Sequence, residues 1–110
     1  MTIYRLSEIC AVSSQIQAGD VAALATDGFT TIICNRPDGE DSGQPTCAAI
    51  ATECAAHGVV FHSIPIARNG LTMEMVESFR QAVAASTGHV LAYCRSGQRS
   101  SVIWQASGSP

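Results

Sequence analysis

Short stretches rich in β-branched residues alternate with alanine-rich stretches along the 110-residue chain. Four stretches have the composition of strands: residues 9–16, 29–34, 59–66 and 89–93. Four others have the composition of helices: residues 19–26, 46–56, the segment that begins at Thr72, and residues 101–106. Strands and helices that alternate with short connections predict a single α/β domain over residues 1–110, with a largely parallel sheet.

The carboxyl ends of parallel strands meet at one edge of a sheet, and α/β domains place their sites at that edge. Three connections would share this edge, namely those after Cys34, after Ile66 and after Tyr93. The first connection, residues 35–45, contains two glycines and two prolines and is predicted to be a loop. Any chemistry is therefore expected from residues of these three connections.

The composition excludes several classes of protein. The net charge is −3, the chain contains no lysine, and its arginines form no continuous basic run, so a nucleic-acid-binding module is not expected. The chain contains no stretch of 18 apolar residues, so no membrane-spanning helix is predicted. The first residues also lack the basic segment and apolar core of a signal peptide, so we expect a cytoplasmic protein.

Five cysteines occur in the chain, at positions 10, 34, 47, 54 and 94. An odd number without a secretory signal predicts reduced thiols rather than a disulfide framework. No pair has the Cys-x-x-Cys spacing of a zinc site, so neither a metal nor another cofactor is expected.

The segment that follows the last predicted strand is the most informative part of the sequence. Cys94 ends an apolar stretch, and a helix begins within a few residues. The N–H groups of such a loop can converge with the positive end of the helix dipole and bind an anion. The same groups would favour the thiolate of Cys94, which predicts a nucleophile at neutral pH.

Each residue of this segment has an expected role. The backbone at Arg95, Ser96, Gly97 and Gln98 would bind the anion, and Gly97 permits the close approach that this requires. The guanidinium of Arg99 can donate two parallel hydrogen bonds to an oxyanion. The hydroxyl of Ser100 or Ser96 could donate to the sulfur. A buried cysteine that only fills space is the alternative, and we favour that alternative for the other four cysteines.

The loop of residues 35–45 supplies further candidates. Asn35, Arg36, Asp38 and Glu40 would lie at the same edge as Cys94, and Arg36 could add to the anion-binding field. Asp38 has three possible roles: an ion pair with an arginine of the Cys94 segment, a displaced general acid, or part of a solvated turn. Cys34 is expected to be a core thiol, with a resolving thiol for Cys94 as the less favoured alternative.

The residues from Cys94 to Arg99, C-R-S-G-x-R, resemble the active loop of rhodanese sulfurtransferases. The wider chain, residues 4–106, resembles a bacterial family of beta-lactamase-hydrolase-like, phosphatase-like domains, some of them labelled sulfur transferases. The segments NRPDGEDSGQP and HSIPI carry this second resemblance. It implies a dual-specificity-phosphatase-like, three-layer α/β fold with a four- to five-stranded mostly parallel sheet flanked by helices. The domain would be shortened at its C-terminus.

Two features depart from cysteine phosphatases. Those enzymes have five residues between the cysteine and the arginine, whereas four residues separate Cys94 from Arg99. They also protonate the leaving group with an aspartate on another loop, whereas residues 67–70, which occupy that place, contain no acid. Both departures favour sulfur chemistry, although the scaffold itself favours phosphate chemistry.

Three hypotheses follow. The leading one is a persulfide-forming sulfurtransferase in which Cys94 takes sulfur from a small sulfane-sulfur donor and passes it to an acceptor thiol. The second is a phosphatase of the protein-tyrosine or dual-specificity type, in which Cys94 forms a phosphocysteine with a phosphorylated substrate. The third is a catalytically idle module that only binds an anion or a phosphoprotein.

Overall fold

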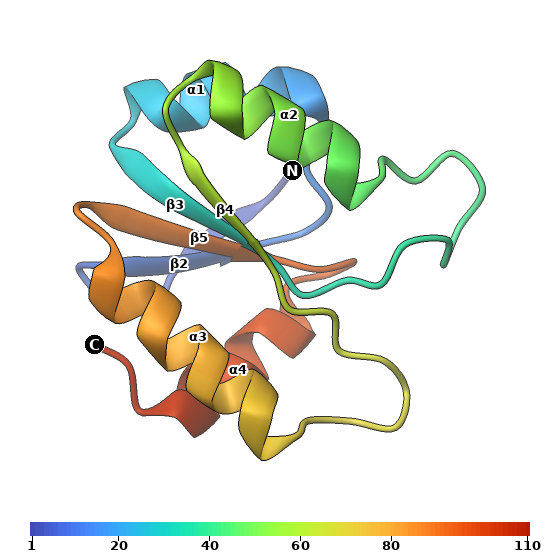
Figure 1. Cartoon of the computed structure of the whole chain (residues 1–110), viewed down its shortest axis with the longest axis vertical. Coiled ribbons are helices and arrows are strands. Elements are labelled where there is room, and N and C mark those ends of the chain that lie inside the picture. Colours follow the sequence, from blue (N-terminus) through green and yellow to red (C-terminus); the bar gives the residue numbers. More distant parts are fainter.

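A five-stranded sheet forms the middle layer of the computed structural model, which describes residues 1–110 (Figure 1). The strands are β1 (Ile3–Arg5), β2 (Cys10–Ser13), β3 (Phe29–Cys34), β4 (Val60–Ser63) and β5 (His89–Tyr93). Their order in the sheet is β1-β2-β5-β3-β4. Only β1 runs antiparallel to its neighbour, so the mostly parallel sheet is confirmed.

Helices cover both faces of this sheet and complete the three layers. A short 3₁₀ turn, η1 (Ala18–Asp20), leads into α1 (Val21–Thr26), and α2 (Cys47–Ala56) follows the long loop after β3. The other two helices are α3 (Met73–Ala85) and α4 (Gln98–Ser107). Figure 1 shows α1 and α2 on one side of the sheet and α3 and α4 on the other.

The two layers of helices bury two separate apolar clusters. Ile50 of α2 and Tyr93 of β5 belong to the cluster beneath α1 and α2. Phe79 of α3 and Ile103 of α4 belong to the cluster on the opposite face. The central strand β5 therefore contributes buried side chains to both clusters, which explains its nearly uninterrupted apolar sequence.

Several boundaries differ from the sequence-based prediction. Strand β1 was not predicted, because its three residues are all exposed and show no alternation of apolar and polar side chains. Strand β4 ends at Ser63, before Pro65, whose nitrogen has no hydrogen to donate. Helix α4 begins at Gln98, three residues earlier than predicted. No helix is long and apolar enough to cross a membrane.

The three loops expected at the site leave the same end of the sheet, as Figure 1 shows. They are joined there by backbone hydrogen bonds. The N–H of Asn35 donates to the carbonyl of Tyr93 at 2.8 Å, and the N–H of Ile66 donates to the carbonyl of Asn35 at 2.9 Å. The N–H of Cys94 donates to Ser13 at 3.3 Å. The register of β2, β3 and β5 thus fixes the relative positions of these loops.

We expect Phe79→Ala to lower the free energy of unfolding by about 3–5 kcal/mol, because it leaves a cavity beneath α3. Phe79 is only 1% exposed. The matched control is Met73→Ala on the same helix, where the side chain is 84% exposed and the expected change is within about 0.5 kcal/mol. Urea denaturation followed by circular dichroism measures both. Similar losses in the two variants would contradict the packing described.

Candidate active site

The turn between β5 and α4 depends on Gly97. This residue is the N-cap of α4 and has a φ of 97°, a left-handed conformation that other residues rarely adopt. A Cβ atom at this position would also lie 3.4 Å from the carbonyl oxygen of Ser13. The chain can therefore turn directly from the strand into the helix, and its N–H groups face the side chain of Cys94.

The sulfur of Cys94 lies beneath this turn, and the residue is fully buried. The N–H of Gly97 donates to the sulfur at 3.1 Å. Burial acts to raise the pKa of the Cys94 thiol, but hydrogen bonds from the N–H groups of Ser100, Gly97 and Ser96, together with the Ser100 hydroxyl, outweigh it and lower the pKa. These hydrogen bonds favour the charged form of Cys94.

The Ser100 hydroxyl has a second partner that the sequence did not indicate. It is fully buried and donates to the side-chain oxygen of Asn35 at 2.9 Å, while the Asn35 amide donates to the carbonyl of Ile64 at 3.0 Å. A hydroxyl has only one hydrogen, so Ser100 can donate either to Asn35 or to the Cys94 sulfur. Asn35 therefore competes with the thiolate for this hydrogen. The only local signal was a polar residue directly after a buried strand.

Arg99 is held by Glu40, a residue to which the sequence analysis gave no role. The Arg99 Nη1 donates to one carboxylate oxygen at 2.8 Å and to the carbonyl of Ile66 at 3.0 Å. The Nη2 donates to the other carboxylate oxygen at 2.9 Å. A guanidinium has five N–H groups, so the Nε–H and one Nη2–H remain for a ligand. Glu40 thus orients Arg99 and leaves one edge of it free.

The electrostatics of this pair follow from the contacts. The hydrogen bond from Arg99 has the largest effect on the pKa of Glu40. Together with the hydrogen bond from Arg36 it outweighs the opposing effect of burial and lowers this pKa to about 2. The carboxylate in turn raises the pKa of Arg99, and the charge of Cys94 adds to this effect. Glu40 is therefore ionised at neutral pH and has no proton to give to a leaving group.

Arg36 supports Glu40 from behind. Its side chain is only 3% exposed. It donates to Glu40 at 2.9 Å, to Asp41 at 2.7 Å and to the side chain of Gln15 at 3.1 Å. All three nitrogens of the guanidinium are engaged, so the contacts direct Arg36 to the carboxylates. The sequence had suggested that Arg36 adds directly to the anion-binding field, but its nitrogens donate to Glu40, Gln15 and Asp41, so it acts on the site only through Glu40 and Arg99.

Asp38 lies apart from Cys94, at the start of α2, where its carboxylate accepts the N–H of Cys47 at 2.9 Å. The ion pair with an arginine of the Cys94 segment, one of three roles considered for Asp38, does not form. Glu40 pairs with Arg99, and Asp41 lies 3.7 Å from Arg95, because the turn after Asp38 points the later acids toward α4. The role of general acid for Asp38 stays a prediction.

An open pocket of about 500 Å³ forms the mouth of the site. It is lined by Glu40, Asp41, Ala67, Arg68, Arg95 and Arg99. The side chain of Arg95 is 71% exposed, and Ser96 and Gln98 are also exposed. An adjoining hollow of about 490 Å³ shares Arg68 and Arg99 and adds apolar side chains such as Leu71 and Val102. The mouth therefore joins a basic region to an apolar one.

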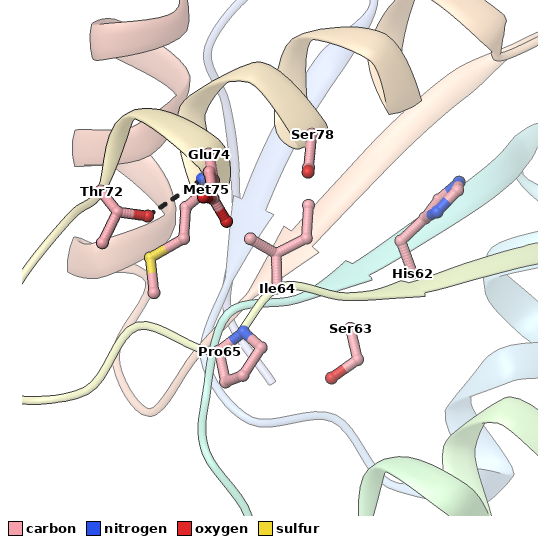
Figure 2. A pocket seen from close by; sticks show the side chains of 8 residues that line it. All are labelled: His62, Ser63, Ile64, Pro65, Thr72, Glu74, Met75 and Ser78. Atoms are coloured by element: carbon pink, nitrogen blue, oxygen red, sulfur yellow. Dashed lines mark hydrogen bonds between the residues drawn. The ribbon is translucent and has the colours of Figure 1, made fainter.

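A second hollow, of about 550 Å³, lies away from this chemistry, between β4 and the first turns of α3. Figure 2 shows its lining, which includes His62, Glu74 and Ser78. It shares no residue with the mouth or with the Cys94 turn. Elsewhere, too, no group of three or more His, Cys, Asp or Glu side chains is arranged to hold a metal ion.

Comparisons with known proteins show which family and which fold this chain resembles. Residues 3–109 match the family described as "Beta-lactamase hydrolase-like protein, phosphatase-like domain". A beta-lactamase hydrolase-like protein of Xylella fastidiosa is 30% identical over 107 residues, which are 97% of this chain and 25% of that protein. This chain therefore spans about a quarter of the length of the curated relatives that it matches.

Solved structures extend the comparison. A Neisseria meningitidis protein, provisionally described as a phosphatase, is 39% identical with a TM-score of 0.84, covering all of this chain and 81% of that one. Pseudomonas aeruginosa TpbA, solved with phosphotyrosine, is 20% identical with a TM-score of 0.66, covering 92% of this chain and 58% of that one. The fold is thus that of the dual-specificity and tyrosine phosphatases, as the resemblance implied.

We expect iodoacetamide at mildly acidic pH to alkylate Cys94 before any other cysteine. The pKa of Cys94 is lowered, whereas burial raises the pKa of Cys54 to about 11 and contributes most to a pKa of about 12 for Cys47. Peptide mass mapping after limited reaction identifies the modified residue. Cys94→Ser is the control and should react slowly. Prior modification of Cys47, the most exposed thiol, would contradict the assignment.

We expect Glu40→Gln to lower kcat/KM about 10- to 100-fold, because hydrogen bonds between charged groups contribute about 1.5–3 kcal/mol. The pKa of Glu40 is about 2, so the ratio of wild-type to variant activity should be the same at pH 5 and pH 8. Steady-state kinetics of both proteins at pH 5 and pH 8 give this ratio of kcat/KM values. The exposed Glu8→Gln is the matched control. A ratio that changes between these pH values would mean that Glu40 acts as an acid.

Proposed function

The chain belongs to the phosphatase-like domain family of beta-lactamase hydrolase-like proteins, and we propose that it hydrolyses phosphate esters through a phosphocysteine at Cys94. The observation that carries the proposal is the pairing of two features. The buried sulfur of Cys94 accepts the N–H of Gly97, and Arg99 beside it is oriented by Glu40 with an edge left free. A nucleophile and an oxyanion donor are thereby fixed before a substrate arrives.

The first chemical step uses these groups directly. The phosphoryl oxygens of the substrate accept the N–H groups of the loop and the free edge of Arg99. The thiolate sulfur of Cys94 attacks phosphorus, a P–S bond forms, and the P–O bond to the leaving group breaks. Because the charged oxygens already face fixed donors, little reorganisation is needed as charge moves in the transition state.

The second step returns the enzyme to its starting state. Water attacks phosphorus, the P–S bond breaks, and inorganic phosphate leaves as dihydrogen phosphate, which keeps the water oxygen and both water protons. Cys94 must depart as a thiolate, and the hydrogen of the Ser100 hydroxyl can turn from Asn35 toward the sulfur at this moment. The competition between Asn35 and Cys94 for that hydrogen therefore gives Ser100 a role in the release of the sulfur.

The leaving group sets the substrate class that we propose. Glu40 is ionised and bound to Arg99, and no carboxylate lies in residues 67–70. A leaving group that is stable without a proton, such as a phenolate, suits this site better than an alkoxide. The apolar hollow beside Arg99 is large enough for an aromatic ring. Aryl phosphates are therefore the preferred class, and the phosphotyrosine bound by the related fold of TpbA is one example.

Sulfur transfer is a second candidate, favoured by one specific observation. Only four residues separate Cys94 from Arg99, as in the rhodanese loop, so fewer N–H groups surround the ligand than in cysteine phosphatases. In this reaction Cys94 attacks the outer sulfur of thiosulfate, the S–S bond breaks, and sulfite leaves as an anion. The resulting persulfide would then pass its outer sulfur to an acceptor thiol.

Parallel assays with equal amounts of protein separate these functions. We expect hydrolysis of p-nitrophenyl phosphate, which has an acidic phenol, to exceed that of an alkyl phosphate by about 10²–10⁴-fold, the usual effect of a missing proton donor. Cys94→Ser should abolish every activity. Asp38→Asn should lower only alkyl phosphate hydrolysis if Asp38 is the general acid.

The other outcomes are equally distinct. Thiosulfate-to-cyanide transfer without phosphate ester hydrolysis would overturn the proposal in favour of the sulfurtransferase. Binding of inorganic phosphate with neither activity would leave only the idle binding module.

A further inference from the structure

Two thiols outside the active site lie in contact. Cys34 is the last residue of β3, Cys47 is the first residue of α2, and their sulfur atoms are 3.2 Å apart. Both are free thiols, and no role in the mechanism falls to either. Cys34 is only 2% exposed, whereas Cys47 is half-buried, so small reagents can reach the pair from the side of Cys47.

A chain of hydrogen bonds passes through the two thiols. The Ser63 hydroxyl donates to the Cys47 sulfur at 3.7 Å, and the Cys47 thiol donates to the Cys34 sulfur. The Cys34 thiol donates to the carbonyl oxygen of Arg36 at 3.2 Å. Figure 2 shows Ser63 on the opposite side of β4 from His62 and Ser78, facing α2. Oxidation of the pair to a disulfide would remove the thiol hydrogen of Cys34, which the carbonyl oxygen of Arg36 now accepts.

The pair also brackets the loop that supports the active site. Residues 35–46 lie between the two cysteines and carry Arg36 and Glu40. Arg36 donates a hydrogen bond to Glu40, and Glu40 orients Arg99. A covalent bond between the ends of this loop would therefore act on Arg99 without touching Cys94.

We propose that Cys34 and Cys47 form a reversible disulfide, with hydrogen peroxide as the oxidant, and that this bond weakens anion binding at Arg99. The two sulfur atoms need to approach by about 1.2 Å to reach the disulfide bond length of about 2.0 Å. Cys34 belongs to the core cluster and Cys47 packs against it, so closing this distance shifts the ends of the loop relative to a packed core.

The chemistry has two balanced steps. The Cys47 sulfur attacks the peroxide, the O–O bond breaks, and Cys47 becomes a sulfenic acid while the other oxygen leaves as water with the thiol proton. The Cys34 sulfur then displaces the hydroxyl, which leaves as a second water with the Cys34 proton. Both sulfurs are oxidised, both peroxide oxygens are reduced, and a dithiol reductant reverses the change.

Cys94 is the faster target for peroxide, so the experiment begins with the Cys94→Ser protein. Burial first and the neighbouring Cys34 second raise the pKa of Cys47 to about 12, and Asp38 acts in the same direction. The pKa of Cys94 is lowered. The Cys94→Ser protein keeps four thiols. Any thiol lost on oxidation of this protein therefore belongs to a cysteine other than Cys94.

After peroxide treatment, denaturation and alkylation, we expect the intact mass to show two alkylated cysteines instead of four. Cleavage after Glu40 and Glu53 places Cys34, Cys47 and Cys54 in separate peptides, and the first two should be linked. An added Cys34→Ser or Cys47→Ser change should abolish the link, whereas Cys54→Ser should preserve it. Four alkylated cysteines, or a link between any other pair, would overturn the proposal.

The effect on the site is measured with inorganic phosphate as the probe. We expect the oxidised Cys94→Ser protein to bind phosphate about three- to tenfold more weakly than the reduced protein, as the loss of one hydrogen bond predicts. Dithiothreitol should restore the affinity, and the Cys47→Ser variant should bind equally before and after oxidation. Equal affinities of the oxidised and reduced proteins would overturn the coupling. This measurement needs no turnover, so it is independent of the proposed function.

Discussion

The burial of the Cys94 sulfur, whose charged form the protein must stabilise, is the constraint on which the rest of this structure depends. An isolated thiolate in the interior is strongly disfavoured, so Cys94 needs donors on several sides. Those donors are N–H groups at the start of α4, which can converge only because Gly97 takes a left-handed conformation. This turn directly follows β5, which ends at Tyr93 and lies at the centre of the sheet.

The neighbouring strands provide what the Cys94 turn lacks. Register between β3 and β5 places Asn35 beside Ser100, where it competes for the hydroxyl hydrogen that also serves the sulfur. The loop after β3 carries Glu40, which joins the buried Arg36 to Arg99. A site that looks local in sequence is therefore assembled from two loops, and the orientation of its arginine is set by a residue 59 positions away.

This assembly explains what the sequence could and could not predict. The alternation of strands and helices, the shared edge of the three loops and the chemistry of the Cys94 segment all follow from short-range patterns, and they were predicted. The roles of Glu40 and Asn35 depend on strand register, which no local pattern encodes. An arginine contact was considered for Asp38 and not for Glu40. Both are acids on one loop, and only the turn between them decides which one reaches α4.

The proton balance of the site connects phosphate and sulfur chemistry. The acids of the loop after β3 are already in use: Glu40 and Asp41 contact arginines, and Asp38, which lies apart from Arg99, accepts a helix N–H. A site arranged in this way stabilises negative charge well and supplies protons poorly. It therefore favours reactions in which the departing group is stable as an anion, and phenolate and sulfite both meet that condition. A phosphoryl group and the sulfite part of thiosulfate each carry three oxygens, so the edge of Arg99 that Glu40 leaves free can donate to either ligand.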